Sequence, residues 1–326
     1  MAKWFVAAKR ADFTKIGQEF GISPVLARII RNRDIIEEEE IRRYLQGTIA
    51  DMYAPGLLKD MEKAVDILLD KIKTGRPIRI IGDYDADGIC STFILHKGLL
   101  RAGATADTAI PHRMKDGYGL NEHLVEDAFQ AGIDTIITCD NGIAAAPQIE
   151  MAKEKGMTVI VTDHHEVPYE EAEGERRYIL PPADAVIDPR QDGDAYPYKG
   201  ICGAVVAYKV IEALYRKLEL TQKEKSLLEE LLELAAFATV CDVMELLDEN
   251  RVIVKFGLSH MKNTANQGLR ALMEVNGIEK GKLSAYHLGF VMGPCLNATG
   301  RLDTAVRALQ LLEAEDRGEA VRIASD

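Results

Sequence analysis

The sequence predicts an α/β protein with a parallel sheet flanked by helices, and two observations lead to this prediction. Between residues 78 and 187, short runs rich in isoleucine, valine and threonine alternate with longer segments of helical periodicity. Such alternation is typical of right-handed crossovers between parallel strands. The flanking stretches are helical in pattern. We therefore expect a helical N-terminal region over residues 1–75, an α/β domain over residues 76–245, and a helical extension over residues 246–326.

The N-terminal region contains three segments with helical signals. Ser23 offers an N-cap, with Pro24 at the first helical position. Residues 35–45 carry glutamates early and arginines late, which suits the helix dipole. Residues 61–72 have apolar side chains at helical spacing, and Gly75 with the proline that soon follows ends this helix.

The strands expected in the α/β domain are short, and three of them lead into turns that carry aspartate or histidine. We place the strands at residues 78–81, 108–110, 135–138, 157–161 and 185–187. A helix over residues 89–100 follows the first strand, and Asn121 can cap the helix after the second.

From Gly203 onward the pattern becomes helical. The expected helices lie at residues 203–218, 221–238, 250–261, 268–275 and 284–292. Residues 293–302 are bracketed by glycines and read as a loop. A final helix is expected to begin near Asp303, as the start of a connector to a further domain.

Composition limits the classes of protein to which the chain can belong. Of its 326 residues, 47% are hydrophobic and 28% are charged, which allows a substantial core. No apolar run approaches the ~20 residues of a membrane helix, and the N-terminal residues do not form a secretion-signal pattern. The five cysteines are scattered, so we expect reduced thiols, a cytoplasmic location and no membrane contact. The net charge of −12 disfavours nucleic-acid binding by bulk attraction but allows a local basic track.

Carboxylates follow the first strand at alternate positions, as Asp83, Asp85 and Asp87. Asp140 follows the third strand and His164 the fourth. Because the carboxyl ends of parallel strands meet at one edge of a sheet, we expect these side chains to converge there. Close carboxylates repel one another unless a cation lies between them. For the first turn alone, a solvated acidic turn is the alternative interpretation.

Four of these residues, Asp85, Asp87, Asp140 and His164, form a donor set for metal ions. Carboxylates with a single imidazole suit Mn²⁺ or Mg²⁺ better than a structural zinc ion. Two such ions roughly 3.5–4 Å apart, bridged by one carboxylate, can hold both the attacking and the leaving oxygen of a phosphoryl displacement. Asp140 lies on the middle turn and is our candidate for the bridge.

Other residues near these turns have two interpretations each. His165 could donate a hydrogen bond to a phosphate oxygen or protonate the leaving group, or the histidine pair could be incidental. Asp163 is better suited to orienting a histidine or a loop amide than to binding metal. Asp83 could contact a metal ion or support its ligands. Asp242 could close the site from the far side or be structural.

The order of these motifs resembles the DHH phosphoesterase superfamily. Its first three motifs correspond to Asp83-x-Asp85-x-Asp87-Gly88, Asp140-Asn141-Gly142 and Asp163-His164-His165. Three further segments resemble the branch that contains single-strand-specific DNA exonucleases: Arg113-x-x-x-Gly117-Tyr118-Gly119, Val240-x-Asp242-Val243 and Asn297-Ala298-x-Gly300-Arg301-Leu302. The resemblance covers essentially the whole chain.

The resemblance implies two divalent ions, usually manganese with magnesium as a substitute, and hydrolysis of single-stranded DNA from a 5′ end. It implies metal binding by Asp85, Asp87, Asp140, His164 and Asp242, with His165 at the scissile phosphate. It also implies DNA repair and recombination as the setting, with a single-strand-binding protein and a helicase as partners.

The loops of the resembling branch indicate substrate contacts by Arg113, Tyr118, Asn297 and Arg301. Arg113 and Arg301 lie on glycine-containing segments of an otherwise acidic chain, where an arginine can hold a phosphate through two hydrogen bonds. An ordinary surface position is the alternative for each arginine.

The sequence departs from the superfamily at two positions. Other branches place a histidine where Ile81 stands, so the metal ligands cannot be those of the pyrophosphatase branch. Related exonucleases often have arginine where Cys295 stands, so one phosphate contact is missing here or comes from elsewhere. The branch also carries a second domain with a Gly-Gly-His motif. We therefore expect an N-terminal catalytic portion that cleaves short substrates slowly and binds long single strands poorly.

Two other functions fit the same motifs. One is a DHH phosphodiesterase that acts on short oligonucleotides or cyclic dinucleotides. The other is a non-catalytic replication scaffold built on a decayed DHH domain, against which the intact Asp85, Asp87, Asp140, His164 and His165 argue.

Overall fold

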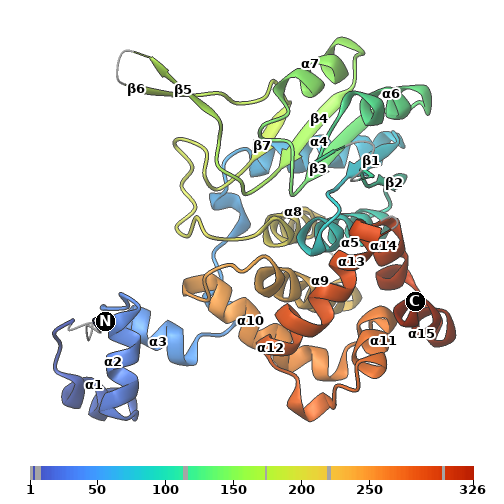
Figure 1. The fold of residues 1–326 in the computed structure, drawn as a ribbon. Coiled ribbons are helices and arrows are strands. Elements are labelled where there is room, and N and C mark those ends of the chain that lie inside the picture. Colours follow the sequence, from blue (N-terminus) through green and yellow to red (C-terminus); the bar gives the residue numbers. More distant parts are fainter. Residues whose placement is uncertain (1–2, 4–8, 113–116, 173–174, 219–221, 303–304) are drawn as a thin grey trace. The chain divides into compact units, whose positions relative to one another are not determined.

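The computed structural model describes residue 3 and residues 9–112, 117–172, 175–218, 222–302 and 305–326 (Figure 1). Contacts between its residues divide the chain into two compact units, Met1–Met52 and Tyr53–Asp326. We describe each unit by itself. The division into three parts at residues 75 and 245 stays a prediction. Within the described residues, no helix is both long enough and apolar enough to cross a membrane.

The first unit is helical, as the sequence predicts. Its helices are α1 (Phe13–Phe20), α2 (Pro24–Asn32), α3 (Glu38–Gln46) and the short η1 (Ile49–Asp51). The Ser23 hydroxyl accepts a hydrogen bond from the backbone N–H of Leu26 and caps α2. Ala27 and Ile30 on α2 and Ile41 on α3 are buried.

A five-stranded parallel sheet forms the centre of the second unit, in the order β2-β1-β3-β4-β7 (Figure 1). The strands are β1 (Ile78–Ile81), β2 (Ala106–Ala109), β3 (Thr135–Cys139), β4 (Thr158–Thr162) and β7 (Ala185–Ile187). All five strands of the sequence analysis are confirmed within two or three residues. β1, β3 and β4 are adjacent, so the turns that follow them lie side by side.

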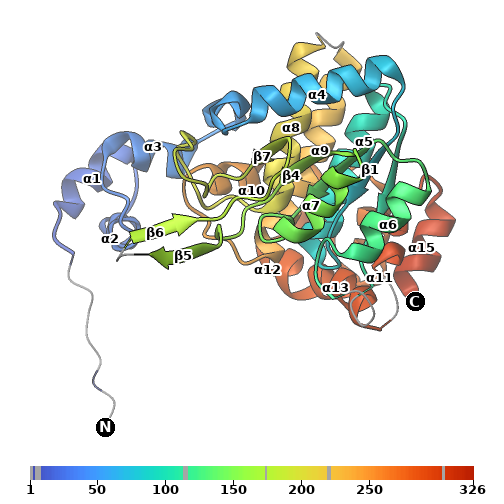
Figure 2. The ribbon, with the colours of Figure 1, turned by 90° about the horizontal axis from the view of Figure 1, so that it is seen from above.

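Helices cover both faces of this sheet (Figure 2). One face carries α6 (Glu122–Gln130) and α7 (Ala146–Glu154), and the other carries α4 (Met61–Thr74), α5 (Ala86–Arg101) and α8 (Gly203–Lys217). A short η2 (Pro55–Leu57) precedes α4. The layer between the sheet and α6 and α7 is an apolar cluster that includes Val125, Ile136 and Ile149. Most of α5 is buried, because helices pack on its outer side as well.

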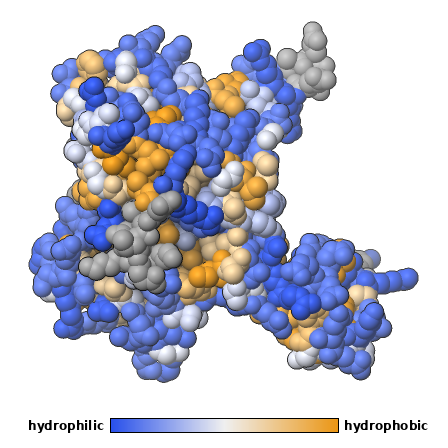
Figure 3. Space-filling model, turned by 180° about the vertical axis from the view of Figure 1, so that it is seen from behind, coloured by the Kyte–Doolittle hydropathy of each residue, from blue (hydrophilic) through white to orange (hydrophobic). Residues whose placement is uncertain are grey.

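The remaining helices pack beyond α5 and α8. They are α9 (Gln222–Cys241), α10 (Asp248–His260), η3 (Met261–Asn263), α11 (Gln267–Val275), η4 (Lys280–Lys282), α12 (Ala285–His287), the π-helical turn η5 (Leu288–Met292), α13 (Gly293–Leu302), α14 (Val306–Glu313) and α15 (Arg317–Ser325). α9 contacts both α5 and α8, and α14 contacts α5. Seen from behind, the surface is mostly hydrophilic with separate hydrophobic patches (Figure 3).

The structure corrects three details of the sequence analysis. Residues 293–302 form helix α13 and not a loop, because the segment continues from η5 and packs against α14 and α5. The expected final helix is two helices, α14 and α15. The structure also contains a hairpin, β5 (Tyr169–Ala172) and β6 (Glu175–Tyr178), which the sequence analysis did not expect; it projects away from the sheet (Figure 1).

Candidate metal centre

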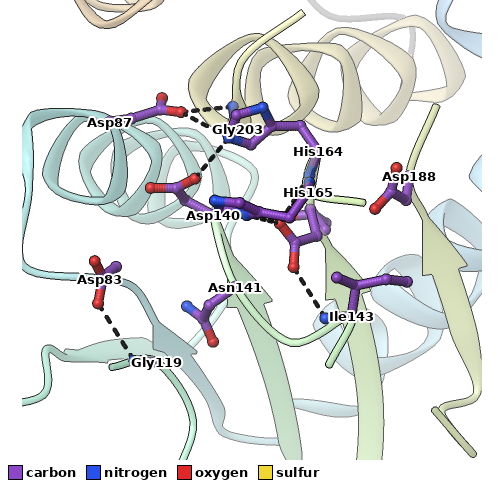
Figure 4. A network of polar contacts seen from close by, with 12 residues as sticks. Asp83, Asp87, Gly119, Asp140, Asn141, Ile143, His164, His165, Asp188 and Gly203 are labelled. Carbon is purple, nitrogen blue, oxygen red and sulfur yellow. Dashed lines mark hydrogen bonds and ion pairs between the residues drawn. The ribbon is translucent and has the colours of Figure 1, made fainter. Parts of the chain in front are cut away.

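The candidate site lies where the turns after β1, β3 and β4 meet the beginning of α8 and the end of α9. Three of the predicted metal ligands, Asp87, Asp140 and His164, come together here and are almost fully buried (Figure 4). Polar side chains are rarely buried without partners, so the contacts of each one show what holds it in place.

The turn after β1 feeds directly into helix α5. Asp85 is the N-cap of this helix, and its Oδ1 accepts hydrogen bonds from the backbone N–H groups of Asp87 and Gly88, both at 3.0 Å. The helix thus begins three residues earlier than predicted, and Asp87 lies in its first turn. A Cβ atom at Gly88 would stand 2.6 Å from the backbone oxygen of Asp83, so only glycine allows this tight turn.

Asp87 is fixed by the backbone at the beginning of α8. The N–H of Gly203 donates to its Oδ2 at 2.7 Å, and the N–H of Ala204 donates to its Oδ1 at 2.8 Å (Figure 4). The first backbone N–H groups of a helix have no partner within the helix and attract anions. Helix α8 therefore orients this carboxylate without using any side chain.

Asp140 follows β3 in a left-handed conformation, with φ of 59°. Aspartate tolerates this region better than most residues. Asn141 holds the turn, since its amide donates to the backbone oxygens of Ile81 and Cys139 at 3.1 and 2.8 Å. Next to it, Gly142 has φ of 112°, and a Cβ atom there would meet the Thr138 hydroxyl at 2.4 Å. The Asp-Asn-Gly sequence is thus explained by the backbone as well as by the carboxylate.

His164 lies at the centre of the carboxylates. Its Nε2 is 3.1 Å from Oδ1 of Asp140, 3.5 Å from Oδ2 of Asp87 and 3.8 Å from Oδ2 of Asp242. Its Nδ1 is buried and has no hydrogen-bond partner among the residues that the structure describes. Asp87, His164 and Asp242 each offer an atom within 4.8 Å of the others, which is a suitable spacing for a metal ion.

Asp163 and His165 form a separate pair beside this cluster. Nδ1 of His165 lies 2.7 Å from Oδ1 of Asp163, and the other oxygen of Asp163 accepts a hydrogen bond from the N–H of Ile143 at 2.9 Å. This hydrogen bond to Asp163 raises the pKa of His165 to about 9. Burial opposes ionisation of Asp163, but its bonds and charge interaction with His165 outweigh burial and lower its pKa. His165 is therefore a cation at neutral pH, with its side chain 46% exposed.

In the carboxylates of the cluster, burial and mutual repulsion outweigh the opposing charge of His165. Burial, followed by the charges of Asp87 and Asp85, raises the pKa of Asp242 to about 7. Burial, with the charge of Asp85, also raises the pKa of Asp83 to about 7. Burial and the neighbouring carboxylates raise the pKa of Asp140 well above its usual range. Asp85 shares a hydrogen bond with Asp140, and burial with the charge of Asp87 raises its pKa too. Such a cluster favours a bound cation.

A cavity of about 390 Å³ opens beside His165. It is lined by the turn after β3, by Gln148 and by Tyr118. The Tyr118 hydroxyl donates to the backbone oxygen of Asp140 at 2.9 Å and lies 3.3 Å from Nε2 of His165. The volume lies within the ~300–1,000 Å³ that is typical of small-molecule sites.

The remaining predicted residues have different outcomes. Asn297 lies on α13 and its Oδ1 accepts a hydrogen bond from the N–H of Ala86 at 2.8 Å, so it contacts the turn of Asp85 and Asp87. Asp83 accepts a bond from the N–H of Gly119 at 3.3 Å. Arg113 lies outside the described residues, and so does the side chain of Arg301. Both arginines stay predictions.

Sequence reasoning missed the backbone of Gly203 and Ala204 and the side chain of Asp188. The helix beginning at Gly203 was predicted, so its anion-binding end could have been inferred. Asp188 is fully buried and its Oδ2 has no partner among the described residues. Burial and the charge of Asp163 raise its pKa to about 7. Its position near Asp163 depends on the pairing of β7 with β4, which no local pattern reveals.

Comparison with known proteins identifies related chains. A curated single-stranded-DNA-specific exonuclease RecJ from Bacillus subtilis is 36% identical over 325 residues, which is 99% of this chain and 39% of the relative. The crystal structure of RecJ from Thermus thermophilus in complex with Mn²⁺ matches with a TM-score of 0.77 and 30% identity, over 96% of this chain and 42% of that one. An exonuclease RecJ bound to manganese matches with a TM-score of 0.73 and 34% identity, over 84% and 66% of the two chains.

The chain spans between about two fifths and one half of the length of the curated relatives it matches. The family model described as the DHH family, N-terminal domain, matches residues 77–239, which is half of the chain. That region contains β1 to β7, the turns that carry Asp87, Asp140 and His164, and the beginning of α8. This chain therefore belongs to the DHH family.

Proposed function

We propose that this chain carries the catalytic core of a metal-dependent exonuclease that hydrolyses single-stranded DNA from the 5′ end. The observation that carries the proposal is the convergence of the Asp87, Asp140 and Asp242 carboxylates on Nε2 of His164. Relatives named as single-stranded-DNA-specific exonucleases are 33–36% identical to the chain.

The residues present fit divalent metal ions. Oxygen ligands with one imidazole nitrogen are the donors that Mn²⁺ and Mg²⁺ take in proteins. The carboxylates are buried close together around a histidine whose pKa burial lowers. We assign Asp85, Asp87, Asp140, His164 and Asp242 as the residues that would hold two ions, with Asp140 as the candidate for a ligand that both would share. Solved RecJ structures contain Mn²⁺ or Mg²⁺, which supports the same choice for this chain.

When bound, such ions polarise the phosphodiester and supply an activated water at neutral pH. The chain itself provides the orientation. The N–H groups of Gly203 and Ala204 fix both oxygens of Asp87, and Asn141 fixes the turn of Asp140. Asp163 keeps His165 protonated, so its ring can donate a hydrogen bond to a phosphate oxygen and can give a proton to the leaving oxygen.

Residues around the metal centre are assigned to substrate binding. Tyr118 lines the cavity beside His165, and Asn297 reaches the turn of Asp87 from α13. We assign these two residues, with Arg113 and Arg301, to contacts with the DNA strand. We further propose that the protein acts in the cytoplasm in DNA repair and recombination, with a single-strand-binding protein and a helicase as partners.

A manganese titration with 5′-labelled and 3′-labelled single-stranded oligonucleotides tests the proposal. A 5′ exonuclease releases the 5′ label at once as a mononucleotide, whereas the 3′ label stays on a shrinking chain. Duplex DNA of the same sequence, single-stranded RNA and cyclic dinucleotides are the matched comparisons. Cleavage of dinucleotides alone would favour the oligonucleotide phosphodiesterase alternative. Binding of Mn²⁺ without hydrolysis of any substrate would favour the scaffold.

A further inference from the structure

The segment α12–η5–α13 exposes two aromatic rings that pack against each other. Tyr286 and Phe290 have ring centroids 5.4 Å apart and planes inclined by 23°. They are 63% and 74% exposed, and Val243 is 86% exposed. Among the described residues, these are three of the four most exposed large hydrophobic side chains. We call Tyr286 and Phe290 the aromatic pair. A helix of a folded protein normally turns such side chains toward the core. The exposure of these two rings therefore needs an explanation other than packing within the chain.

The same segment contacts the candidate metal centre. A Cβ atom at Gly289 would lie 3.3 Å from Val240, and one at Gly293 would lie 2.6 Å from the Cys241 sulfur. Val240 and Cys241 are the last two residues of α9, directly before Asp242. Asn297 then accepts the hydrogen bond from Ala86 at the turn of Asp85 and Asp87. The two glycines therefore let the segment approach α9 closely, and one continuous helical segment joins the aromatic pair to the metal-binding turns.

Helical geometry sets the distance between the aromatic pair and Asn297, which contacts the metal-binding turn. Phe290 and Asn297 are seven residues apart, or ~10 Å along a helix axis. That length corresponds to about three stacked nucleotides.

The backbone near the aromatic pair is unusual in two places. η5 is a π-helical turn, a form that is rare in helices and often found at functional sites. Val243, which directly follows Asp242, has φ of 58°, a strained conformation for a β-branched residue.

Two exposed rings in one stack match the faces of nucleic-acid bases. Proteins that hold single strands combine aromatic side chains, on which bases stack, with cations that follow the phosphates. Two exposed lysines, Lys280 and Lys282, lie on η4, just before this segment in the chain. Lys282 forms an ion pair with Glu279 at 2.9 Å, which leaves Lys280 as the nearer candidate for a phosphate contact. A protein partner would instead favour a broader apolar patch around the rings.

We propose that the aromatic pair is a stacking platform for the bases of a single strand whose phosphates lead to the metal centre. The assignment rests on the proposed function and specifies where the strand lies. It also provides a base-binding element within this acidic chain, where the sequence analysis expected poor binding of long single strands. The platform does not discriminate between bases, because every base has an aromatic face.

The test compares variants of the full chain with Mn²⁺ on three substrates. The variants are Tyr286→Ala, Phe290→Ala, the double variant and Phe290→Trp. Tyr178→Ala is the matched control, because Tyr178 is also an exposed tyrosine beside a second ring, Tyr169, but lies on the hairpin. The substrates are a 5′-phosphorylated oligothymidylate, the same oligonucleotide with abasic sites at nucleotides three to five, and bis(p-nitrophenyl) phosphate.

The double variant should raise KM for the oligothymidylate about tenfold or more, with kcat nearly unchanged. It should leave the KM for the abasic oligonucleotide and the rate with the small ester unchanged. Phe290→Trp should keep the parent KM, and Tyr178→Ala should have no effect. Melting temperatures of the variants should equal that of the parent, since the rings are exposed.

Three results would overturn the platform. They are equal KM values of the parent and the double variant, an equal loss on the abasic strand, and a parent dimer that becomes monomeric in the double variant by sedimentation. The third result would identify the rings as a contact between copies. Failure of the proposed function is a separate outcome, because the parent would then hydrolyse none of the substrates. Fluorescence anisotropy of the labelled oligonucleotide would still report whether the aromatic pair binds it.

Discussion

Helix α8 contacts two buried polar clusters that differ in how their charge is compensated. At its beginning, Gly203 and Ala204 hold Asp87 within the carboxylates around His164. Two turns later, Lys209 is fully buried, with its Nζ 2.7 Å from Oε1 of Glu249 and 2.6 Å from the backbone oxygen of Tyr53. We call the residues Lys209, Glu249, Tyr53 and Tyr196 the Lys209 cluster.

In the Lys209 cluster every charge has a partner. Glu249 also accepts hydrogen bonds from the Tyr196 hydroxyl and from the N–H of Tyr53. In the metal centre, several carboxylates surround one histidine whose pKa is lowered, and the pKa values of Asp140 and Asp242 rise instead. Burial is thus accompanied by paired charges in the Lys209 cluster and by carboxylates with raised pKa values in the metal centre. The charges of the Lys209 cluster are compensated within the chain, whereas those of the metal centre would be compensated by an added cation, which would then stabilise the folded state.

The largest expected effect is that of Asp140→Asn. Asparagine keeps the shape and tolerates the left-handed backbone, so the change removes mainly charge. We expect hydrolysis to fall by about 10⁴-fold or more, as when one member of a catalytic unit is removed. Calorimetry should find one Mn²⁺ ion or none where the parent binds two. Retention of two tight sites with full activity would refute the bridging position.

The next effect concerns the pair of Asp163 and His165 beside the metal centre, in which each charge has a partner. His165→Ala should lower kcat by roughly 10²–10⁴-fold while leaving Mn²⁺ affinity almost unchanged, because His165 is held by Asp163 rather than by the metal ligands. Tyr118→Phe is the comparison variant, since it keeps the imidazole of His165 and removes the hydroxyl that lies near its Nε2 and donates to the backbone oxygen of Asp140. A parallel loss of metal affinity would mean that His165 is itself a ligand, as its distance to Asp140 and His164 allows.

The Lys209 cluster should respond in stability and not in metal binding. Lys209→Met leaves Glu249 buried without its cation, and we expect a loss of about 3–5 kcal/mol in the free energy of unfolding. The double variant Lys209→Met/Glu249→Gln should recover part of this loss, because it removes the buried charge of Glu249. The recovery should be incomplete, since Glu212, 3.7 Å from Lys209, also loses this cation. Urea unfolding without Mn²⁺ measures the loss of stability and its recovery, and the additional stability with Mn²⁺ reports whether metal binding is unchanged. An undiminished stability in Lys209→Met would mean that water reaches the cluster.

The smallest expected effect is a pH-dependent change in melting temperature caused by the uncompensated carboxylate of Asp242. The pKa of Asp242 is about 7 in the folded chain and 3.8 ordinarily, so the folded chain holds an extra proton between these values. Its contribution to stability is therefore present below about pH 4 and is lost as the pH rises through 7. With a chelator at pH 8, Asp242→Asn should melt about 2–4 °C above the parent, and at pH 4 the two should coincide. An equal difference at both pH values would contradict this origin.

The parts of the fold that the sequence predicted are those with local causes. The β-branched runs of β1, β3 and β4, bounded by polar turns, specified the sheet and placed Asp87, Asp140 and His164 at one edge of it. The Ser23 cap and the amphipathic pattern of α4 were equally local. The roles of the site residues stay predictions until the experiments above are done.

The parts that were missed depend on contacts between distant segments. Gly293 and Pro294 read as loop residues, but the glycine is required because the Cys241 side chain packs against it, and η5 precedes the proline with a wider turn. The hairpin had a signal that went unused: Glu170 is paired with Arg177, and Glu171 with Arg176. The approach of Asp242 to His164 follows from the packing of α9 on α5 and α8, which no local pattern contains.

The backbone bonds that hold Asp87 have a consequence for how this family can diverge. A contact made by a side chain is lost by one substitution, whereas N–H groups at the beginning of a helix are present for almost any sequence. The constraint falls instead on the space that lets α8 approach, since a Cβ atom at Gly203 would stand 2.8 Å from the Cβ of Asp140. A mutational scan should therefore find little tolerance at this glycine, while the solvent-facing positions of α8 remain free to drift.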